Sequence, residues 1–349
     1  MNLRLPAGSA PRPLALALAL AAGFPLAPDA HAATTGRAQA GASLGIYSTW
    51  DLAPTSSATG TGYRDDIVVQ TANKVGDPPS ADIQVYDGVT RARVELQTQG
   101  ALLQSGGGDP LPVAGMRTVE SDLAAGTLRL TSKGSYAATP PPFQARVAYA
   151  QGYAFAEVIQ NFDVRWSTDH VGPVDVRLDA MVDGQVLQND GSDGWMAGLG
   201  LYLNLGGVNT GLPPLIFPDP APVARYESGV AGGKVSIGGN VINTQCFAGA
   251  GYCESFLSLY AAVDMRGRKL EDGSTDFFKG NAHDFDFLAR LSLTTSPGVT
   301  VLRVDGLGNV LPQYAWVNPV PVPEPGNVLL LAAFGQWWVL PRLHGLRVT

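Results

Sequence analysis

The sequence predicts an all-β fold: an antiparallel, jelly-roll-like β-sandwich, with an N-terminal signal helix before it and a short C-terminal hydrophobic helix after it. Apolar and polar residues alternate in many short segments, which is typical of strands with one buried face. The 349 residues include 42 glycines and 26 prolines but only 15% charged residues, a composition that favours strands and turns. No segment between the two ends shows a long 3.6-residue apolar stripe. A closed barrel has the same alternation and is the structural alternative.

The first 32 residues have the three parts of a secretory signal peptide. Arg4 and Arg12 supply the positive region, and residues 14–26 supply the apolar core. Ala30-His31-Ala32 is a small-x-small cleavage site, so we expect the mature chain to begin at Ala33. Residues 1–32 are therefore predicted to direct export.

The first strong strand pattern lies around Asp87-Gly88. This dipeptide separates two alternating segments, residues 81–86 and 89–96, and predicts a two-residue hairpin. In that register Asp82 lies opposite Arg93. The residues expected to face the core are Ala92, Val94 and Leu96, with Arg91, Arg93 and Glu95 on the other face.

The same alternation recurs in four later segments, so the pattern continues along the chain. The predicted inward positions are Val174, Val176, Leu178, Ala180 and Val182; Leu199, Leu201, Leu203 and Leu205; Leu257, Leu259, Ala261 and Val263; and Phe285, Phe287, Ala289, Leu291 and Leu293. We expect turns at Asp183-Gly184 and at Ser296-Pro297-Gly298. The Pro-rich stretches 139–142 and 212–222 are interpreted as loops, which gives one all-β domain over residues 33–317.

The only two cysteines are Cys246 and Cys253, and six small or Gly-rich positions separate them. An exported chain meets an oxidising compartment, where an even number of cysteines favours pairing. We therefore predict a disulfide between them.

Residues 318–349 form a Pro-rich linker and a tail with three parts. The linker contains Val322-Pro323-Glu324-Pro325, an apolar run follows over residues 328–340, and Arg342 and Arg347 lie at the end. The run has 13 residues, whereas a spanning helix needs about 20. It therefore predicts a marginal span with its positive end in the cytoplasm.

This order of parts resembles the PEP-CTERM sorting signal of exported proteins in Gram-negative bacteria. The resemblance implies an exosortase-type processing enzyme as partner and a transient hold in the inner membrane through the tail. It also implies a final location at the cell surface or in an exopolysaccharide matrix. Residues 283–304, with an Asp-Phe strand start and a Pro-Gly turn, are loosely similar to the end of many such proteins. The rest of the domain resembles no family that we recognise.

The charge of the chain argues against one class of partner. The formal charge is −7, and it becomes −10 when residues 1–32 and 326–349 are left out. Nucleic acids and anionic lipids select basic surfaces, so we expect no nucleic-acid partner.

Motifs for metal binding or nucleophilic catalysis are weak. His170 and His283 are the only histidines of the predicted mature domain, residues 33–317, and neither lies in a zinc-binding spacing, so we expect both at the surface or in loops. Gly41-Ala42-Ser43-Leu44-Gly45 matches the spacing of a nucleophile elbow but has no helical pattern after it. The segment 189–194, with Asp190 and Asp193, has oxygen ligands for a weak calcium site, although a polar turn explains it equally.

Paired carboxylates could act in glycoside hydrolysis if the fold brought them together. The candidates are Asp65 with Asp66, Asp284 with Asp286, and Glu157. Alternation at an exposed face already explains Asp284 and Asp286, so we assign no catalytic residue.

Three functions follow, and a structural or adhesive role in an exopolysaccharide or biofilm matrix is the leading one. A carbohydrate-binding module is the second, since Trp166, Trp195 or Tyr202 could stack on sugar rings, although packing in the core or at its rim explains each. An extracellular glycan-active enzyme is the third, and it requires two acids that converge in one cleft.

Overall fold

The computed structural model describes residues 36–76, 78–86, 90–104, 107–139, 147–189, 197–206, 222–226, 229–241, 244–267, 283–304 and 309–318. Within these ranges the regular elements are strands, and they pair antiparallel. The expected signal helix and C-terminal hydrophobic helix fall outside the described residues. Among the residues described, none forms a helix with the length and apolarity needed to cross a membrane.

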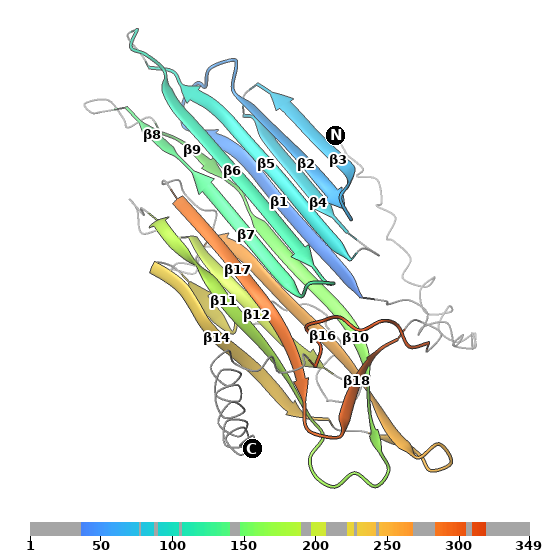
Figure 1. Cartoon of the computed structure of the whole chain (residues 1–349). Helices are drawn as coiled ribbons and strands as arrows, with labels where there is room; N and C mark the ends of the chain where they lie inside the picture. Colours follow the sequence, from blue (N-terminus) through green and yellow to red (C-terminus); the bar gives the residue numbers. More distant parts are fainter. Residues whose placement is uncertain are drawn as a thin grey trace, which may run out of the picture.

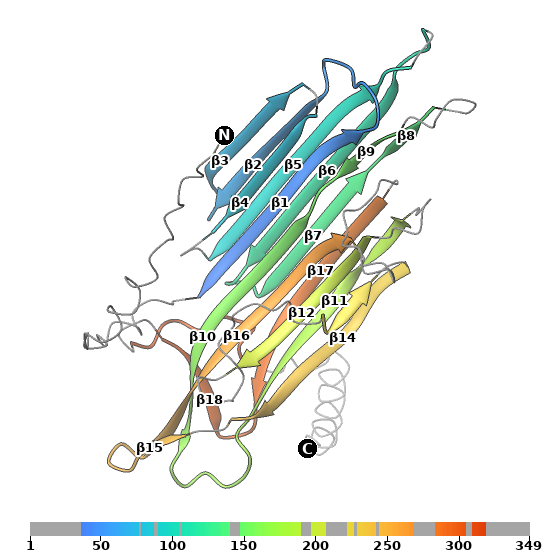
Figure 2. The same cartoon turned by 180° about the vertical axis from the view of Figure 1, so that it is seen from behind.

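The strands form two sheets that stack as a β-sandwich, which confirms the all-β prediction (Figure 1). The eight-stranded sheet has the order β14 (Gly229–Asn240), β11 (Asp175–Asn189), β17 (His283–Thr295), β7 (Thr127–Gly134), β6 (Leu111–Asp122), β5 (Arg91–Leu102), β2 (Ser57–Arg64) and β3 (Ile67–Val75). The ten-stranded sheet has the order β13 (Ala224–Tyr226), β12 (Ala197–Gly206), β16 (Tyr252–Gly267), β10 (Ala154–Ser167), β1 (Arg37–Ser48), β9 (Val147–Gln151) and β8 (Tyr136–Ala138). Its three further strands are β4 (Ser80–Val85) on β1, β15 (Gln245–Phe247) on β16 and β18 (Val299–Arg303) on β10. The view from behind shows the long strands of both layers running in one diagonal direction (Figure 2).

The two-residue period explains which side chains lie between the sheets. The predicted inward positions of the four later segments are buried or half-buried, from Val174 to Leu293. On β1 the inward residues are small at first, with Ala38, Ala40 and Ala42 before Leu44 and Ile46. Each fully buried Leu, Ile or Phe contributes about 1.5–3 kcal/mol of burial free energy, so these stripes dominate the stability of the sandwich.

The strand β10 organises the ten-stranded sheet. One of its edges pairs with β16 over the whole length of β10. The other edge pairs with β1 at residues 154–159 and with β18 at residues 162–166. The outward residues of β10 therefore lie in the middle of the sheet, with paired strands on both sides.

The predicted hairpin at Asp87-Gly88 is wrong in its strand pairing. The two residues themselves lie outside the described residues, but the strands on either side belong to different sheets. Asp82 lies opposite Ser43 of β1, whereas Arg93 lies opposite Glu120 of β6. The chain therefore crosses from one layer to the other here, because the two-residue period sets the face of a strand and not its partner.

The predicted faces at the same place are confirmed. Ala92, Val94 and Leu96 are buried, and the side chains between them are less so. Both strands thus present an apolar face to the same core from opposite sides.

The expected turn at Asp183-Gly184 is also wrong, because β11 continues through both residues to Asn189. Gly184 lies opposite Phe287, and a Cβ on it would be only 2.2 Å from the carbonyl oxygen of Asp286. Glycine is therefore required by this close approach of two strands and not by a turn. The register of the β11–β17 pair shifts just beyond, between Val186 and Gln188.

The last described segment closes one end of the sandwich. Tyr314, Trp316 and Val317 are buried there. The Trp316 indole donates a hydrogen bond to the Leu123 carbonyl oxygen at 2.8 Å, and the Asn318 amide donates to the Leu293 carbonyl oxygen at 2.6 Å.

Candidate functional site

Many of the residues singled out in the sequence lie outside the described residues. These are the sorting residues 322–325 with Arg342 and Arg347, the cleavage site at residues 30–33, the calcium candidates Asp190 and Asp193, and Trp195.

The predicted disulfide is confirmed. Cys246 of β15 and Cys253 of β16 are directly opposite each other and are bonded, with an S–S distance of 2.03 Å. The rings of Phe247 and Tyr252, the next pair in the ladder, are 5.5 Å apart. The bond therefore closes a hairpin at one end of the ten-stranded sheet.

The expectation of a surface position is wrong for His283, which is buried at the start of β17. It lies opposite Gly134, where a Cβ would be 2.3 Å from the imidazole Cε1, so the glycine leaves space for the ring. The imidazole Nε2 is 2.9 Å from the Ser132 hydroxyl. His170 is half-buried in the turn after β10. Among the described residues, no three His, Cys, Asp or Glu side chains form a group that could hold a metal ion.

The Ser132 hydroxyl also accepts a hydrogen bond from Nε of Arg117, at 3.0 Å. Arg117 is fully buried, and burial lowers the pKa of its guanidinium to about 9. Its Nη1 donates to the carbonyl oxygens of Ser43 and Tyr153. These two carbonyls lie where the chain passes between β9 and β10 beside β1, and the Tyr153 carbonyl oxygen also accepts from the Ser43 amide at 3.0 Å, so Arg117 adds a buried donor to backbone groups at this irregular point of the sheet. Ser43 itself lies within β1, which is not the strand-to-helix turn of a nucleophile elbow.

The outward side of the ten-stranded sheet carries the most suggestive cluster. Strand registers align its residues in rows that cross β4, β1, β10, β16 and β12. The first row is Gln84, Gly41, Phe155, Asp264 and Gly200. The second row is Gln39, Glu157, Ala262 and Tyr202, and the third is Arg37, Ile159, Tyr260 and Asn204. With Asp82, Tyr86 and Tyr153 at its margin, we call this surface the tyrosine–carboxylate face.

Glycines in the first row allow aromatic rings to lie over the strands. A Cβ on Gly41 would be 2.4 Å from the Phe155 ring, so this ring occupies the space above Gly41. The Tyr153 ring lies beside it, with centroids 6.3 Å apart and planes 15° apart. Likewise, the Tyr202 ring occupies the space above Gly200. The sheet therefore supports rings that lie along its surface.

Glu157 is the carboxylate at the centre of this face. Burial raises the pKa of Glu157 above its ordinary value, although Arg37 and a hydrogen bond from the Tyr260 hydroxyl oppose the shift. With its amide oriented to suit its neighbours, Gln39 donates to Glu157 at 2.6 Å and accepts from Arg37 at 2.8 Å. Glu157 is thus a partly desolvated carboxylate that is held by three polar side chains.

The carboxylates of this face also raise the pKa values of the tyrosines at its margin. Burial raises the pKa of Tyr86, and the charges of Glu157 and Asp82 raise it further. Burial and a hydrogen bond to Asp82 raise the pKa of Tyr153 to about 12. The Tyr153 hydroxyl donates to Asp82 at 2.8 Å and accepts from the Gln84 amide. These tyrosines therefore stay protonated and serve as hydroxyl donors and apolar surface.

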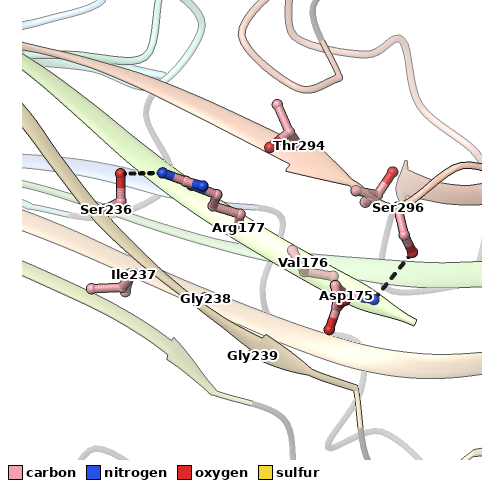
Figure 3. Close-up of a pocket in the computed structure, with 10 residues that line it drawn as sticks. Asp175, Val176, Arg177, Ser236, Ile237, Gly238, Gly239, Thr294 and Ser296 are labelled. Atoms are coloured by element: carbon pink, nitrogen blue, oxygen red, sulfur yellow. Dashed lines mark hydrogen bonds between the residues drawn. The ribbon is translucent and has the colours of Figure 1, made fainter. Parts of the chain in front are cut away.

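A hollow on the opposite sheet has a different character. It has a volume of about 530 Å³ and lies over the ends of β11, β14 and β17. Figure 3 shows Arg177 reaching toward Ser236, and Ser296 beside the backbone of Asp175. Hydrogen bonds from Lys234, Ser236 and Arg177 outweigh the effect of burial and lower the pKa of the neighbouring Asp179. The residues that line the hollow include no aromatic ring, so the hollow lacks a surface on which a sugar ring could stack.

The carboxylates chosen from the sequence do not come together. Glu157 lies on the ten-stranded sheet, whereas Asp284 forms an ion pair with Lys133 on the eight-stranded sheet, at 2.8 Å. Asp65 and Asp66 form the turn between β2 and β3, and Asp66 pairs with Arg91 at 3.1 Å. Trp166 is buried in the core, while Tyr202 lies on the tyrosine–carboxylate face. Alternation along β10 marks Phe155 and Glu157 as outward residues, but the cross-strand rows depend on pairings that sequence periodicity does not specify.

A scan of the sequence against models of protein families finds no match, and a search of the curated proteins finds none either.

Proposed function

We propose that this protein is exported, is sorted by a PEP-CTERM-type tail, and serves a structural or adhesive role in an extracellular matrix. The observation that carries the proposal is the order of Val322-Pro323-Glu324-Pro325, an apolar run and terminal arginines. The proposal includes processing by an exosortase-type enzyme, transient retention of the tail in the inner membrane and a surface location in a Gram-negative bacterium. It also includes a helix in the signal peptide, a helix in the tail and a jelly-roll-like topology of the sandwich.

Two features of the folded domain support it. The Cys246–Cys253 bond suits an oxidising compartment, which is where structural disulfides persist. The docked chain reaches Asn318, so the Pro-Glu-Pro motif follows the folded body after a short Pro-rich linker. The sequence predicts an extended linker, because proline fixes φ and disfavours helix in the residue before it. We therefore expect a processing enzyme to reach the motif.

The test is the intact mass of the exported protein from a host with an exosortase. We expect a chain that starts at Ala33 and has lost or modified its tail near Pro325. The triple variant Pro323→Ala, Glu324→Ala and Pro325→Ala should retain the tail, and the control Pro319→Ala with Pro321→Ala should be processed normally. An unprocessed tail in the outer fraction of the wild-type host would sink the proposal.

Carbohydrate binding is the second candidate, and the tyrosine–carboxylate face is the observation that favours it. Rings on a sheet, next to carboxylate and amide groups, provide both stacking surface and hydrogen-bond partners. A glycan-active enzyme would additionally need two acids at a separation that suits bond cleavage. Release of reducing ends from a polysaccharide would select the enzyme over the binding protein.

A further inference from the structure

We infer that the tyrosine–carboxylate face binds a neutral polysaccharide along the rows that cross β4, β1 and β10. The inference deepens the proposed function, because it names a ligand class for a matrix protein. It stands on the arrangement of Tyr86, Tyr153 and Phe155 around Gln84 and Glu157.

The rings supply the apolar contact. Phe155 is half-buried and lies above Gly41, so the backbone supports its ring from below. Tyr153 presents a nearly parallel plane beside it, and Tyr86 is 42% exposed at the end of β4. Sugar rings have apolar C–H faces that pack against the negative face of an aromatic ring.

The polar groups supply the directional contacts. The Tyr153 hydroxyl, the Gln84 amide and the Asp82 carboxylate are already linked by hydrogen bonds, which fix their orientation. A preformed network loses less side-chain entropy when a ligand binds. Carboxylates accept and amides both donate and accept, so together they match the hydroxyl groups of a sugar.

The charge of the face selects among polysaccharides. Asp82, Glu157 and Asp264 are acidic, whereas the basic residues lie at the ends of the rows, with Arg37 in the third row and Arg225 of β13 beyond Gly200 in the first. A uronic acid or sulfate group that entered these rows would meet like charge in a partly desolvated place, which is unfavourable. A neutral hexose polymer avoids this repulsion.

The hollow on the eight-stranded sheet suits such a ligand less well. Its lining is mostly hydroxyl, glycine and charged groups without a ring, and Arg177 is already engaged with Asp179 and Ser236. The aromatic rows are therefore the better platform.

The experiment is affinity electrophoresis of the purified protein in gels that contain hydroxyethylcellulose or galactomannan as neutral probes, or alginate as the acidic probe. We expect retardation by at least one neutral probe and none by alginate. Phe155→Leu keeps an apolar side chain and removes the ring, and Tyr86→Ala removes the exposed ring. Each should weaken binding about tenfold, which corresponds to about 1.4 kcal/mol.

Controls separate the site from general effects. Phe247→Ala removes an exposed ring in the disulfide hairpin and should bind like the wild type. Gly41→Ala should weaken binding because a Cβ displaces the Phe155 ring. Thermal unfolding of each variant shows whether it is folded, and Phe155→Tyr should retain binding in the same fold.

Several outcomes would overturn the inference. These are no retardation by either neutral probe, equal retardation by alginate, or equal loss of binding in Phe247→Ala. Release of reducing ends would assign the face to catalysis, and a dimer lost in Phe155→Leu would assign it to a second copy of the chain. Tail processing is measured separately by intact mass, so failure of binding and failure of sorting are distinguishable.

Discussion

Glu157 occupies an unusual position for a charged residue, because it lies on the outward side of a sheet and is nevertheless largely desolvated. Its folded pKa is raised by burial, so the folded state holds its proton to a higher pH than the unfolded chain does. Between the ordinary pKa and the raised one, the folded state binds more protons, and stability falls as pH rises. At pH values above the raised pKa, Glu157 is ionised in both states, and the folded state is destabilised by the full free energy of burying its charge.

We therefore predict that Glu157→Gln raises the free energy of unfolding at pH 7, by up to about 1 kcal/mol. The gain should disappear below about pH 4, where both states of the wild type are protonated. Urea unfolding at both pH values measures it. The control Glu120→Gln breaks a charge pair with Arg91 at 2.9 Å and should give a small loss at pH 7. A loss of stability in Glu157→Gln at pH 7 would show that its hydrogen bonds outweigh its desolvation.

Arg117 presents the opposite case, since its buried charge serves the backbone. Replacing a buried charge by an apolar side chain is often harmless when all its partners are replaced as well. Here two partners are backbone carbonyl oxygens, which no side-chain substitution can remove. The Tyr153 carbonyl would keep its hydrogen bond from the Ser43 amide, so the Ser43 carbonyl is the group most affected by the loss of Arg117. Each buried group without a partner costs about 1–3 kcal/mol, which exceeds the relief from removing the charge.

We predict that Arg117→Leu lowers the free energy of unfolding by about 1–3 kcal/mol. Chemical denaturation of the exported protein measures the change. Arg129→Leu, at an exposed position on the neighbouring strand β7, should stay within about 0.5 kcal/mol of the wild type. Equal stability of the Arg117 variant and the wild type would contradict the backbone role.

At the scale of elements, the alternation of residues predicts faces well and partners poorly. It places Ala92, Val94 and Leu96 inward, as observed. However, β4 and β5 are neighbours in sequence and belong to different sheets, so the Asp-Gly signal does not produce a ladder there. Local periodicity describes one strand, whereas pairing depends on the whole core, which lets β4 complete β1 instead.

The candidate site is limited in the same way. Outward positions of β10 are visible in the sequence, but β10 and β16 are separated by about one hundred residues, and their register brings Phe155 beside Asp264. The disulfide was predictable because it depends on two nearby cysteines only. Gly41 shows what the sequence does not predict. Its role as a support for the Phe155 ring depends on the pairing of β1 with β10, which is known only from the structure.

The disulfide hairpin allows a prediction for a single element. The strand β15 has three residues, all exposed, and pairs only with β16, whereas β16 also pairs with β10. The double variant Cys246→Ser and Cys253→Ser should lose at most about 2–3 kcal/mol, because the closed loop is short.

Hydrogen exchange should show which residues are destabilised when the disulfide is removed. Amides of residues 245–247 should lose protection in the double variant, while amides of residues 257–263 keep theirs. Alkylation of the exported wild type without reductant should label neither cysteine. Labelling of both would contradict the bond, and loss of protection throughout β16 would contradict its local role.

For the whole molecule, the two long edges of the eight-stranded sheet are exposed. Ile67, Val68, Val69 and Val75 of β3 are solvent-accessible, and Lys74 is the only charged residue of that strand. An exposed apolar edge strand favours pairing with other chains. We predict that Ile67→Lys with Val75→Lys lowers concentration-dependent association, measured by light scattering. The thermal stability of the double variant should equal that of the wild type. If association is as strong as in the wild type, the chains associate through a surface other than β3.

The end of the folded body gives the last prediction. Trp316 contacts the Phe162 ring edge-on, with centroids 6.1 Å apart, and fills the space beside Gly126, where a Cβ would be 2.5 Å from the indole. Val317 bridges to Leu293, so residues 314–318 complete the core. The proposed sorting tail follows this segment in the sequence.

We therefore predict that a chain truncated after Pro325 unfolds at the same temperature as the full-length protein once both are purified. Trp316→Ala should lose about 3–5 kcal/mol, because it removes a large buried side chain and leaves a cavity. Calorimetry measures both, and Trp50→Ala, at an exposed position, is the control. If truncation after Pro325 destabilised the domain as much as Trp316→Ala does, the tail would be part of the fold, and its removal by a processing enzyme would unfold the protein that it delivers. Unchanged stability instead means that sorting can discard the tail without cost to the sandwich.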